Sequence, residues 1–433
     1  MSGLAKHLSG CGYTVSGCDL VKNSLTDELE RLGINVNCGN NCCDLNCTDA
    51  LIYTSAIEHN NQVLKKAQKN KTPIYSRSQL LGKVLSGYKK TIAISGSHGK
   101  TTATAMIADA VILAGLDPTV FLGGESVSYG NYRKGNENNI AIAEACEYKK
   151  SFLDIKPDIS VVLNIDNDHL DCYRDMDELC SSFGKFISGS ISVINADDVR
   201  AVNISNMTSV TFGINNLAVY AAQKIKFNGV GYSFTVHAFG LAKGRVNLKV
   251  MGKHNIYNAL AAIAVCDLLK IPFYITKKAL ENFCGVKRRC EYIGDIDGVE
   301  CFCDYAHHPK EILATLNSFN EQGVPYAVVF QPHTYSRTKN LMQEFVSALT
   351  RKQKVAVYKT YPAREQFDIL GDGKTLYKNL TKSGKNTAFY IKNEQELEDF
   401  IKKVKNEYNR IIFLGAGDIY DIAKSLRIKE KKV

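Results

Sequence analysis

The stretch that decides the fold is TIAISGSHGKTTATAMIADAVILAGL, residues 91–116. Residues 91–95 are β-branched and apolar, which is typical of a buried strand. From Lys100 the sequence is rich in Ala, Ile, Met and Leu and ends at Gly115, which predicts a helix with a C-terminal glycine stop. A strand, a tight turn and a helix in this order form the repeating unit of an α/β fold.

The turn GSHG between this strand and this helix predicts a phosphate-binding loop. A glycine-rich turn before a helix aims several backbone N–H groups at one point, and the helix dipole favours an anion there. Lys100 adds a positive charge, and Thr101 offers a hydroxyl to Mg²⁺. The general phosphate-loop pattern has a further glycine where this chain has Ile94, so a plain strand-turn-helix without a ligand stays open.

Composition excludes several classes of protein. A chain of 433 residues favours two to four domains. No apolar run approaches ~20 residues, and the N-terminus lacks an export signal, so we expect a cytoplasmic protein without a membrane span. The fourteen cysteines are scattered, and we expect reduced thiols. The net charge of +10 comes from dispersed lysines without a basic, aromatic-lined stripe, which favours anionic substrates over nucleic acid.

Apolar runs of strand length recur along the whole chain and alternate with helical patterns. This alternation predicts parallel sheets covered by helices on both faces, and so an α/β protein. We expect three domains, with boundaries at residues 1–88, 89–287 and 288–433. The predicted strands lie in GYTVSGCDL, DALIYTSAI, NIAIAEA, ISVVLNID, ISVINADD, VECFCDYAHH, YAVVFQPH, KVAVYKTY and RIIFLGAGDI.

Ligands of open parallel sheets bind at the carboxyl ends of the strands, so polar residues there are the candidates for a site. In the central region these residues are Glu144, Glu147, Asp166, Asp168 and His169. Oxygen ligands suit Mg²⁺, which keeps phosphate and water in its shell. The functional interpretation is a magnesium site beside the phosphate loop. The alternative is that these are ordinary polar residues at strand ends, without a ligand.

Two strings of the third region, DYAHHP and QPHTYSRT, also follow predicted strands. We expect their polar residues to converge at one crevice. Arg337 suits bidentate binding of a carboxylate. The candidates are Asp304, Tyr305, His307, His308, His333 and Arg337.

These motifs together resemble the Mur ligase family. The matching strings run in the family's order over nearly the whole chain: GSHGKTT, EACEY, NIDNDHLD, GKHNIYNALAA, GVKRRCEY, DYAHHPKEI and FQPHTYSRT. The family's own phosphate loop lacks the glycine at Ile94, and EACEY resembles a variant of its EADES string. DYAHHP and HTYSRT resemble the branch that adds L-alanine.

The resemblance implies ATP-dependent ligation of L-alanine to the carboxylate of UDP-N-acetylmuramate through an acyl phosphate, for peptidoglycan precursor synthesis, with ATP and Mg²⁺ as cofactors. It implies a phosphate cradle of Gly96, Ser97, His98, Gly99, Lys100, Thr101 and Thr102. It implies metal ligands Thr101, Glu144 and His169, with Lys100, Glu144, His169 and Arg288 (or Arg289) acting in catalysis. It implies nucleotide contacts from His254, Asn255 and Asp304, and an alanine pocket of Tyr305, His307, His333 and Arg337.

The N-terminal region departs from the family pattern. Family members have an apolar strand and a glycine-rich turn before the string MSGLA, whereas this chain opens at MSGLA itself. We therefore expect three domains of which the first is Rossmann-like without its first strand, the second is a P-loop ATPase-type domain, and the third is Rossmann-like. A misplaced start and a naturally short chain are the two explanations. Asp19 and Ser55 resemble UDP-side positions.

Three rival functions stay open. A sibling ligase would attach a whole peptide during wall recycling, and the acceptor that supports phosphate release would identify it. A phosphate-loop motor or switch would hydrolyse ATP without a carboxylate acceptor. An inactive, truncated member would bind without turnover. The sequence does not give the oligomeric state.

Overall fold

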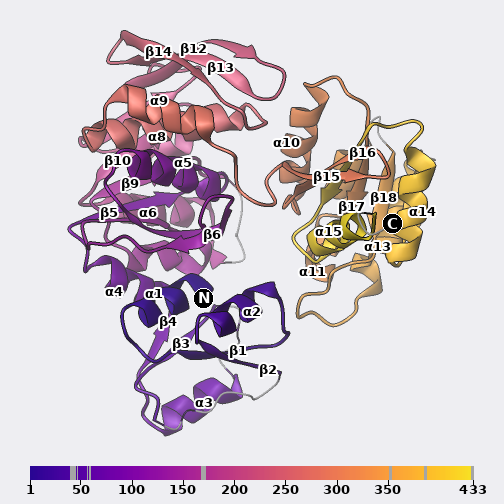
Figure 1. Cartoon of the computed structure of the whole chain (residues 1–433), viewed down its shortest axis with the longest axis horizontal. Coiled ribbons are helices and arrows are strands. Elements are labelled where there is room, and N and C mark those ends of the chain that lie inside the picture. The colour runs from indigo at the N-terminus through magenta and orange to yellow at the C-terminus, as the bar shows by residue number, and fades with distance from the viewer. Residues whose placement is uncertain are drawn as a thin grey trace. The chain divides into compact units, whose positions relative to one another are not determined.

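The computed structural model describes residues 1–39, 45, 47–55, 57, 60–166, 172–350, 354–384 and 388–430 (Figure 1). The chain divides into two compact units. The first comprises Met1–Asn228, Tyr232–Lys249 and His254–Cys284, and the second Gly229–Gly231, Val250–Lys253 and Gly285–Val433. The predicted border at residue 88 lies inside the first unit, so our three-domain division stays an interpretation.

The first unit carries the elements up to α9. They are α1 (Ser2–Gly10), β1 (Ser16–Asp19), α2 (Ser24–Arg31), β2 (Asn35–Cys38), β3 (Leu51–Tyr53), α3 (Gln62–Lys69), β4 (Ile74–Ser76), α4 (Arg77–Leu85), β5 (Lys90–Ser95), α5 (Lys100–Leu113), β6 (Thr119–Ser126), β7 (Gly130–Arg133), β8 (Ile140–Glu144), η1 (Tyr148–Asp154), β9 (Ile159–Val162), α6 (Met176–Ile187), β10 (Ile191–Asn195), α7 (Val199–Asn203), β11 (Ser209–Gly213), β12 (Tyr220–Phe227), β13 (Tyr232–Ala238), β14 (Leu241–Asn247), α8 (His254–Leu268) and α9 (Phe273–Asn282).

The second unit carries the remaining elements. They are β15 (Glu291–Ile296), β16 (Val299–Asp304), α10 (Pro309–Asn320), β17 (Tyr326–Phe330), α11 (Tyr335–Asn340), α12 (Met342–Leu349), β18 (Val355–Tyr358), η3 (Ile369–Gly371), α13 (Gly373–Lys382), β19 (Ala388–Ile391), α14 (Glu394–Val404), β20 (Arg410–Leu414) and α15 (Ile419–Glu430).

A ten-stranded sheet forms the centre of the first unit, in the order β14-β13-β12-β11-β10-β9-β5-β8-β6-β7. The strands from β12 to β6 pair in parallel, as predicted. The two ends of the sheet are antiparallel, which corrects the expectation of a parallel sheet throughout. There the chain turns back directly without a crossover helix, and direct turns join antiparallel strands.

Helices cover both faces of this sheet (Figure 1). On one face η1 and α6 supply the aromatic cluster of Phe152, Phe183 and Phe186, and α4 adds leucines to the same core, which packs on strand residues such as Ala93 and Val162. On the other face α5 and α8 pack against each other and the strands. Almost every residue of α8 from Asn255 to Cys266 is buried. The phosphate-loop helix is therefore held in a large, continuous core.

The N-terminal strands form two separate parallel pairs, β1–β2 and β3–β4. Helix α1 is formed by the string SGLAKHLSG at the start of the chain. Lys6 on α1 reaches Glu28 at 2.7 Å and Asn131 at 3.1 Å, which ties the N-terminal segment to α2 and β7. Cys18 is disulfide-bonded, so the expectation of reduced thiols is wrong at that position. The other described cysteines are free thiols.

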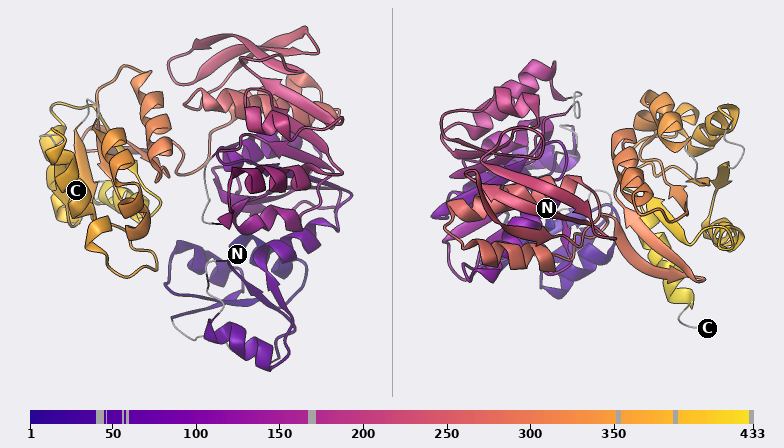
Figure 2. Two further views of the ribbon diagram at one scale, coloured as in Figure 1. Left: turned by 180° about the vertical axis from the view of Figure 1, so that it is seen from behind. Right: turned by 90° about the horizontal axis from the view of Figure 1, so that it is seen from above.

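The second unit is a six-stranded sheet in the order β15-β16-β20-β17-β18-β19 with helices on both faces (Figure 2). Alternate strand residues face opposite cores, as the strand period requires. Val329 and Phe413 face α14 and α15, whereas Val328 and Phe330 face α10, α12 and α13. All its strand pairs are parallel except β15–β16.

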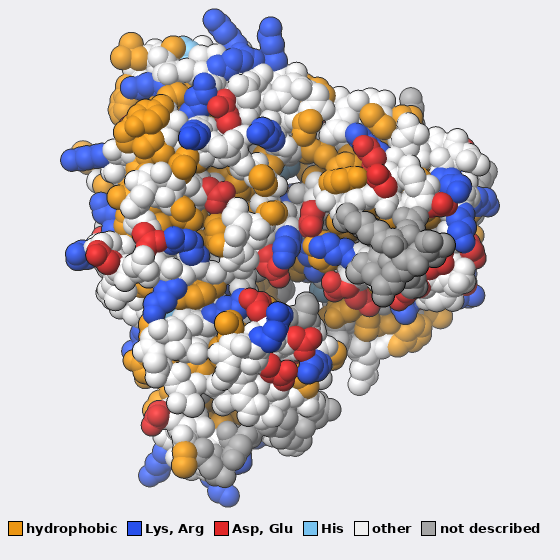
Figure 3. Space-filling model, in the orientation of Figure 1, with side chains coloured by type: hydrophobic (Ala, Val, Ile, Leu, Met, Phe, Trp, Pro, Cys, Tyr) orange, Lys and Arg blue, Asp and Glu red, His pale blue; other side chains and the backbone are white. Residues whose placement is uncertain are grey.

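The surface carries mixed charge. Lys and Arg side chains are spread over the visible face and interleaved with Asp and Glu, as the dispersed lysines of the sequence predict (Figure 3). Within the described residues, no helix has both the length and the hydrophobicity of a transmembrane span.

Candidate active site

The predicted phosphate loop connects β5 to α5. Two glycines give the loop its shape, because Gly96 has φ +136° and Gly99, the residue before α5, has φ +87°. A Cβ on Gly99 would lie 2.8 Å from the Asn258 amide oxygen on α8. Left-handed backbone and close approach both favour glycine here. The predicted strand, turn and helix are therefore confirmed, with the helix ending before Gly115.

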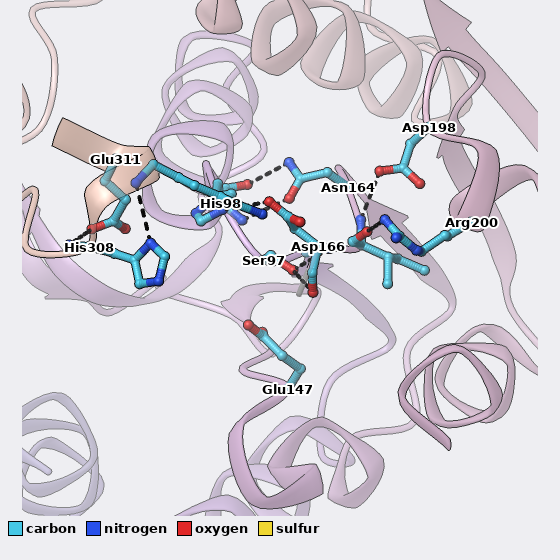
Figure 4. Close-up of polar contacts among 12 residues, drawn as sticks. Ser97, His98, Glu147, Asn164, Asp166, Asp198, Arg200, His308 and Glu311 are labelled. Atoms are coloured by element: carbon cyan, nitrogen blue, oxygen red, sulfur yellow. Dashed lines mark hydrogen bonds and ion pairs between the residues drawn. The ribbon is translucent and has the colours of Figure 1, made fainter. Parts of the chain in front are cut away.

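The loop is tied to the segment that follows β9 (Figure 4). The Asn164 side chain makes a reciprocal pair with His98: its Oδ1 accepts from the His98 N–H at 2.8 Å, and its amide donates to the His98 carbonyl at 3.0 Å. The Asn164 carbonyl accepts from the Ser97 N–H at 3.0 Å. Ser97 Oγ in turn accepts from the Asp166 N–H at 2.8 Å. Asn164 therefore fixes the shape of the loop.

These contacts divide the predicted cradle into two parts. The N–H groups of Ser97 and His98 bond to Asn164, so they hold the loop itself. The N–H groups of Lys100, Thr101 and Thr102 lie in the first turn of α5, where a helix offers them no intrahelical acceptor. A phosphate group placed at this helix end meets those donors and the positive end of the dipole.

Lys100 projects from the same turn. Its Nζ donates to the Gly96 carbonyl at 2.5 Å and the Ser97 carbonyl at 3.2 Å, and it lies 3.0 Å from both carboxylate oxygens of Glu147. Burial lowers the pKa of Lys100, but the negative charge of Glu147, aided by Cys146 and Glu144, outweighs it and raises the pKa above the usual value. The lysine is therefore a charged ammonium at neutral pH.

Glu144 ends β8, the strand next to β5. The parallel register places it opposite Ile94, two residues before the loop begins. Its Oε1 accepts from the Gly123 N–H on β6 at 2.7 Å. Asp168 and His169 lie outside the described residues. Among the residues that are described, no group of three His, Cys, Asp or Glu side chains forms a metal site on its own.

The predicted adenine-side residues His254 and Asn255 open helix α8. Asn255 Oδ1 accepts from the Asn258 amide at 2.8 Å, and Asn258 packs against Gly99. The first turn of α8 is thus connected to the phosphate loop by one side chain, which supports placing His254 and Asn255 near a bound nucleotide.

In the second unit the predicted alanine-pocket residues come together at the ends of β16 and β17. The Tyr305 and His307 ring centroids are 5.3 Å apart, and those of His307 and His333 are 5.8 Å apart. Arg337 Nη1 lies 3.3 Å from His333 Nδ1 and donates to the His333 carbonyl at 3.1 Å. His308, also a candidate, instead caps the start of α10.

The two histidines of this cluster are neutral. Burial lowers the pKa of His307, and the nearby Arg337 lowers it further against the opposing charge of Glu311. Burial, then His307 and Arg337, lowers the pKa of His333 to about 4. Arg337 is consequently the cation of the cluster at neutral pH.

Arg288 and Asp304 are engaged within the second unit. The Arg288 guanidinium donates to the Gly417 carbonyl at 2.6 Å and stacks on Tyr305 and Tyr420. Asp304 accepts from the N–H groups of Ala306 and Cys290, each at 2.8 Å, and from the Thr315 hydroxyl at 3.1 Å. These contacts favour structural roles for Arg288 and Asp304.

Sequence reasoning missed two residues that shape the site. Asn164 lies two residues after the end of β9, so the rule that selected Glu144 and Asp166 would also have selected it. Tyr173 donates its hydroxyl to the Glu147 carbonyl at 2.5 Å, and no local pattern around it predicts this contact.

The chain is similar to known proteins along nearly its whole length. The family models "Mur ligase family, catalytic domain", "Mur ligase middle domain" and "Mur ligase, glutamate ligase domain" match residues 1–89, 94–266 and 288–417. A UDP-N-acetylmuramate–L-alanine ligase of Acetivibrio thermocellus is 37% identical over all of this chain and 94% of its own length. One of Lachnospira eligens is 38% identical over 98% of this chain and 95% of its own.

A solved structure of UDP-N-acetylmuramate-alanine ligase from Thermotoga maritima superimposes with a TM-score of 0.85 at 29% identity, over 100% of this chain and 96% of that one. A parallel α/β sheet that carries a lysine-bearing phosphate loop, with a second α/β unit after it, defines a nucleotide-binding α/β enzyme. The chain belongs to the Mur ligase family. The predicted resemblance and the α/β fold class are therefore confirmed.

Proposed function

We propose that the protein joins L-alanine to the carboxylate of UDP-N-acetylmuramate with conversion of ATP to ADP and phosphate, in peptidoglycan precursor synthesis. The observation that carries the proposal is the match to L-alanine ligases along the whole chain. In this reaction the carboxylate attacks the γ-phosphate of ATP, ADP leaves and an acyl phosphate forms. The amine of L-alanine then attacks the acyl carbon, and phosphate leaves as the amide bond forms and the amine gives up a proton, so that no water is consumed overall. Positioning and neutralisation of charge supply most of the acceleration in such phosphoryl transfers.

The phosphate loop binds ATP. Backbone donors of Lys100, Thr101 and Thr102 face the phosphate oxygens, and the Lys100 ammonium neutralises charge on the γ-phosphate as it is transferred. Asn164 keeps the loop in shape while this happens. Arg289 is the better arginine for the phosphates, because Arg288 is bonded to the Gly417 carbonyl.

The described residues near the phosphate loop include the kinds of ligand that Mg²⁺ prefers. Thr101 offers a hydroxyl at the start of α5, and Glu144 a carboxylate at the adjacent strand end, which are the hard oxygen ligands that Mg²⁺ prefers. These two residues would hold one ion, and His169 would help to hold a second. The bound ion would neutralise phosphate charge during the transfer. Gly123 orients Glu144 through its N–H.

The alanine pocket selects its substrate by charge. Arg337 binds the carboxylate of L-alanine, and its planar fork suits that geometry. His307 and His333 are neutral, so they do not repel the ammonium form of the amino acid. A histidine with a pKa of about 4 is a weak base at neutral pH, so His333 orients the substrate and does not take its proton.

Phosphate release by the purified chain tests the function. The assay contains Mg-ATP with UDP-N-acetylmuramate and L-alanine, separately and together, and we expect release only when both are present. Release with a tripeptide in place of L-alanine would identify the sibling ligase, and release without either would identify a switch or motor ATPase. Lys100→Ala should lower turnover at least about 100-fold with an unchanged melting temperature. Near-normal turnover of that variant would contradict the role of the loop.

A further inference from the structure

The lysine of the phosphate loop has a buried carboxylate partner that the reaction described above does not use. Both oxygens of Glu147 lie 3.0 Å from Lys100 Nζ. The Glu147 side chain is 1% exposed, against 16% for Lys100. Its backbone carbonyl accepts a hydrogen bond from the Tyr173 hydroxyl. Glu147 is therefore held both at its backbone and at its side chain.

We propose that Glu147 is the positioning residue of Lys100: it keeps the ammonium aimed at the γ-phosphate and stays paired with it when ATP binds. The phosphate then takes the place of the Gly96 and Ser97 carbonyl oxygens. The inference rests on the phosphate-loop role proposed above.

The hydrogen-bond acceptors around the Lys100 ammonium explain why phosphate replaces a carbonyl oxygen and not Glu147. An ammonium has three N–H donors, and here they face the Gly96 carbonyl, the Ser97 carbonyl and the Glu147 carboxylate. A phosphate oxygen can bind only where one of these acceptors leaves. Separating Glu147 from Lys100 would break a buried ion pair, which costs far more than releasing a neutral carbonyl. A phosphate in the carbonyl's place adds a charge-assisted hydrogen bond.

The test compares Glu147→Gln with Glu178→Gln. Glu178 pairs with Lys150 at 2.7 Å on the same face of the sheet and has no proposed role in the reaction. Phosphate release is measured against ATP concentration with both substrates. We expect Glu147→Gln to lower kcat about 10-fold to 100-fold and to change KM for ATP much less. Glu178→Gln should stay within about twofold of the parent.

Three results would overturn the inference. A higher kcat with tighter ATP binding in Glu147→Gln would mean that Glu147 competes with phosphate for Lys100. A lower kcat matched by an equally large rise in KM for ATP would mean that Glu147 only supports the shape of the loop. Normal kinetics of Glu147→Gln beside an inactive Lys100→Ala would refute this inference and leave the phosphate-loop role standing, whereas an active Lys100→Ala would refute that role itself.

Glu147→Asp covers the case in which the glutamine variant does not fold. It keeps the charge and shortens the side chain by one methylene. We expect kcat to fall and KM for ATP to change little, because the ammonium keeps its partner but is drawn away from the phosphate. A parent-like kcat in Glu147→Asp would contradict the positioning role.

Discussion

Asn164→Ala isolates the contact that shapes the phosphate loop. The substitution removes the reciprocal pair with His98, two hydrogen bonds of 2.8 Å and 3.0 Å, and leaves the backbone bond between Ser97 and Asn164 in place. Each such bond contributes about 0.5–1.5 kcal/mol, so the loop loses about 1–3 kcal/mol of preference for its present shape. At 1.4 kcal/mol for each factor of ten, MgATP should bind about 5-fold to 150-fold more weakly.

Calorimetric titration with a non-hydrolysable ATP analogue measures this affinity directly. Asn139→Ala is the matched control, because it removes an amide that bonds to Glu137 in another loop of the same unit. The control should bind the analogue as the parent does, and both variants should keep their melting temperatures within a few degrees. An Asn164→Ala protein with parent affinity would show that the loop keeps its geometry without this side chain.

Three further substitutions test other parts of the site. Gly99→Ala should lower the melting temperature by several degrees and weaken ATP binding. The reason is that a Cβ there meets Asn258 and that the left-handed backbone costs an alanine about 1–2 kcal/mol. The control is Gly184→Ala on the open side of α6, which should be neutral or stabilising. The pKa of His333 is about 4 in the folded protein against 6.5 for a free histidine, so the unfolded chain takes up the proton first and stability falls as the pH drops from about 6.5 towards 4. Urea unfolding at pH 7 and 4.5 measures the free energy of unfolding that each protein loses on acidification. His333→Asn should lose about 1–2 kcal/mol less than the parent, and equal losses would contradict the burial of a neutral ring. Arg337→Lys should raise KM for L-alanine about tenfold and leave MgATP affinity unchanged, since a lysine cannot form the planar double contact; a parent-like KM would place the alanine carboxylate elsewhere.

The sequence was most informative where local chemistry sets the structure. The β-branched run before Gly96 and the apolar run after Lys100 predict β5 and α5 correctly, because strand burial, glycine geometry and helix propensity all act within a few residues. The strand-end rule placed Glu144 beside the loop, since the register of neighbouring parallel strands follows from their hydrophobic pattern.

Contacts made over long sequence separations could not be predicted in the same way. The pairing of Asn164 with His98 joins residues 66 positions apart, and that of Arg288 with Gly417 joins residues 129 apart. Such contacts depend on how the strands are ordered in the sheet. The antiparallel ends of the large sheet were missed for a related reason: the alternation of strands and helices does not show where a strand turns back without a helix.

The interior position of β5 affects how the protein opens. β5 lies between β9 and β8, with α5 and α8 packed on one face and the Phe152 cluster on the other. Sheet ends such as β14 and β7 have one neighbouring strand each, so they can fray without disturbing the centre. We therefore expect amide protons of β5 to exchange with solvent far more slowly than those of β14 and β7. The backbone that carries the phosphate loop then belongs to the part of the sheet that opens last.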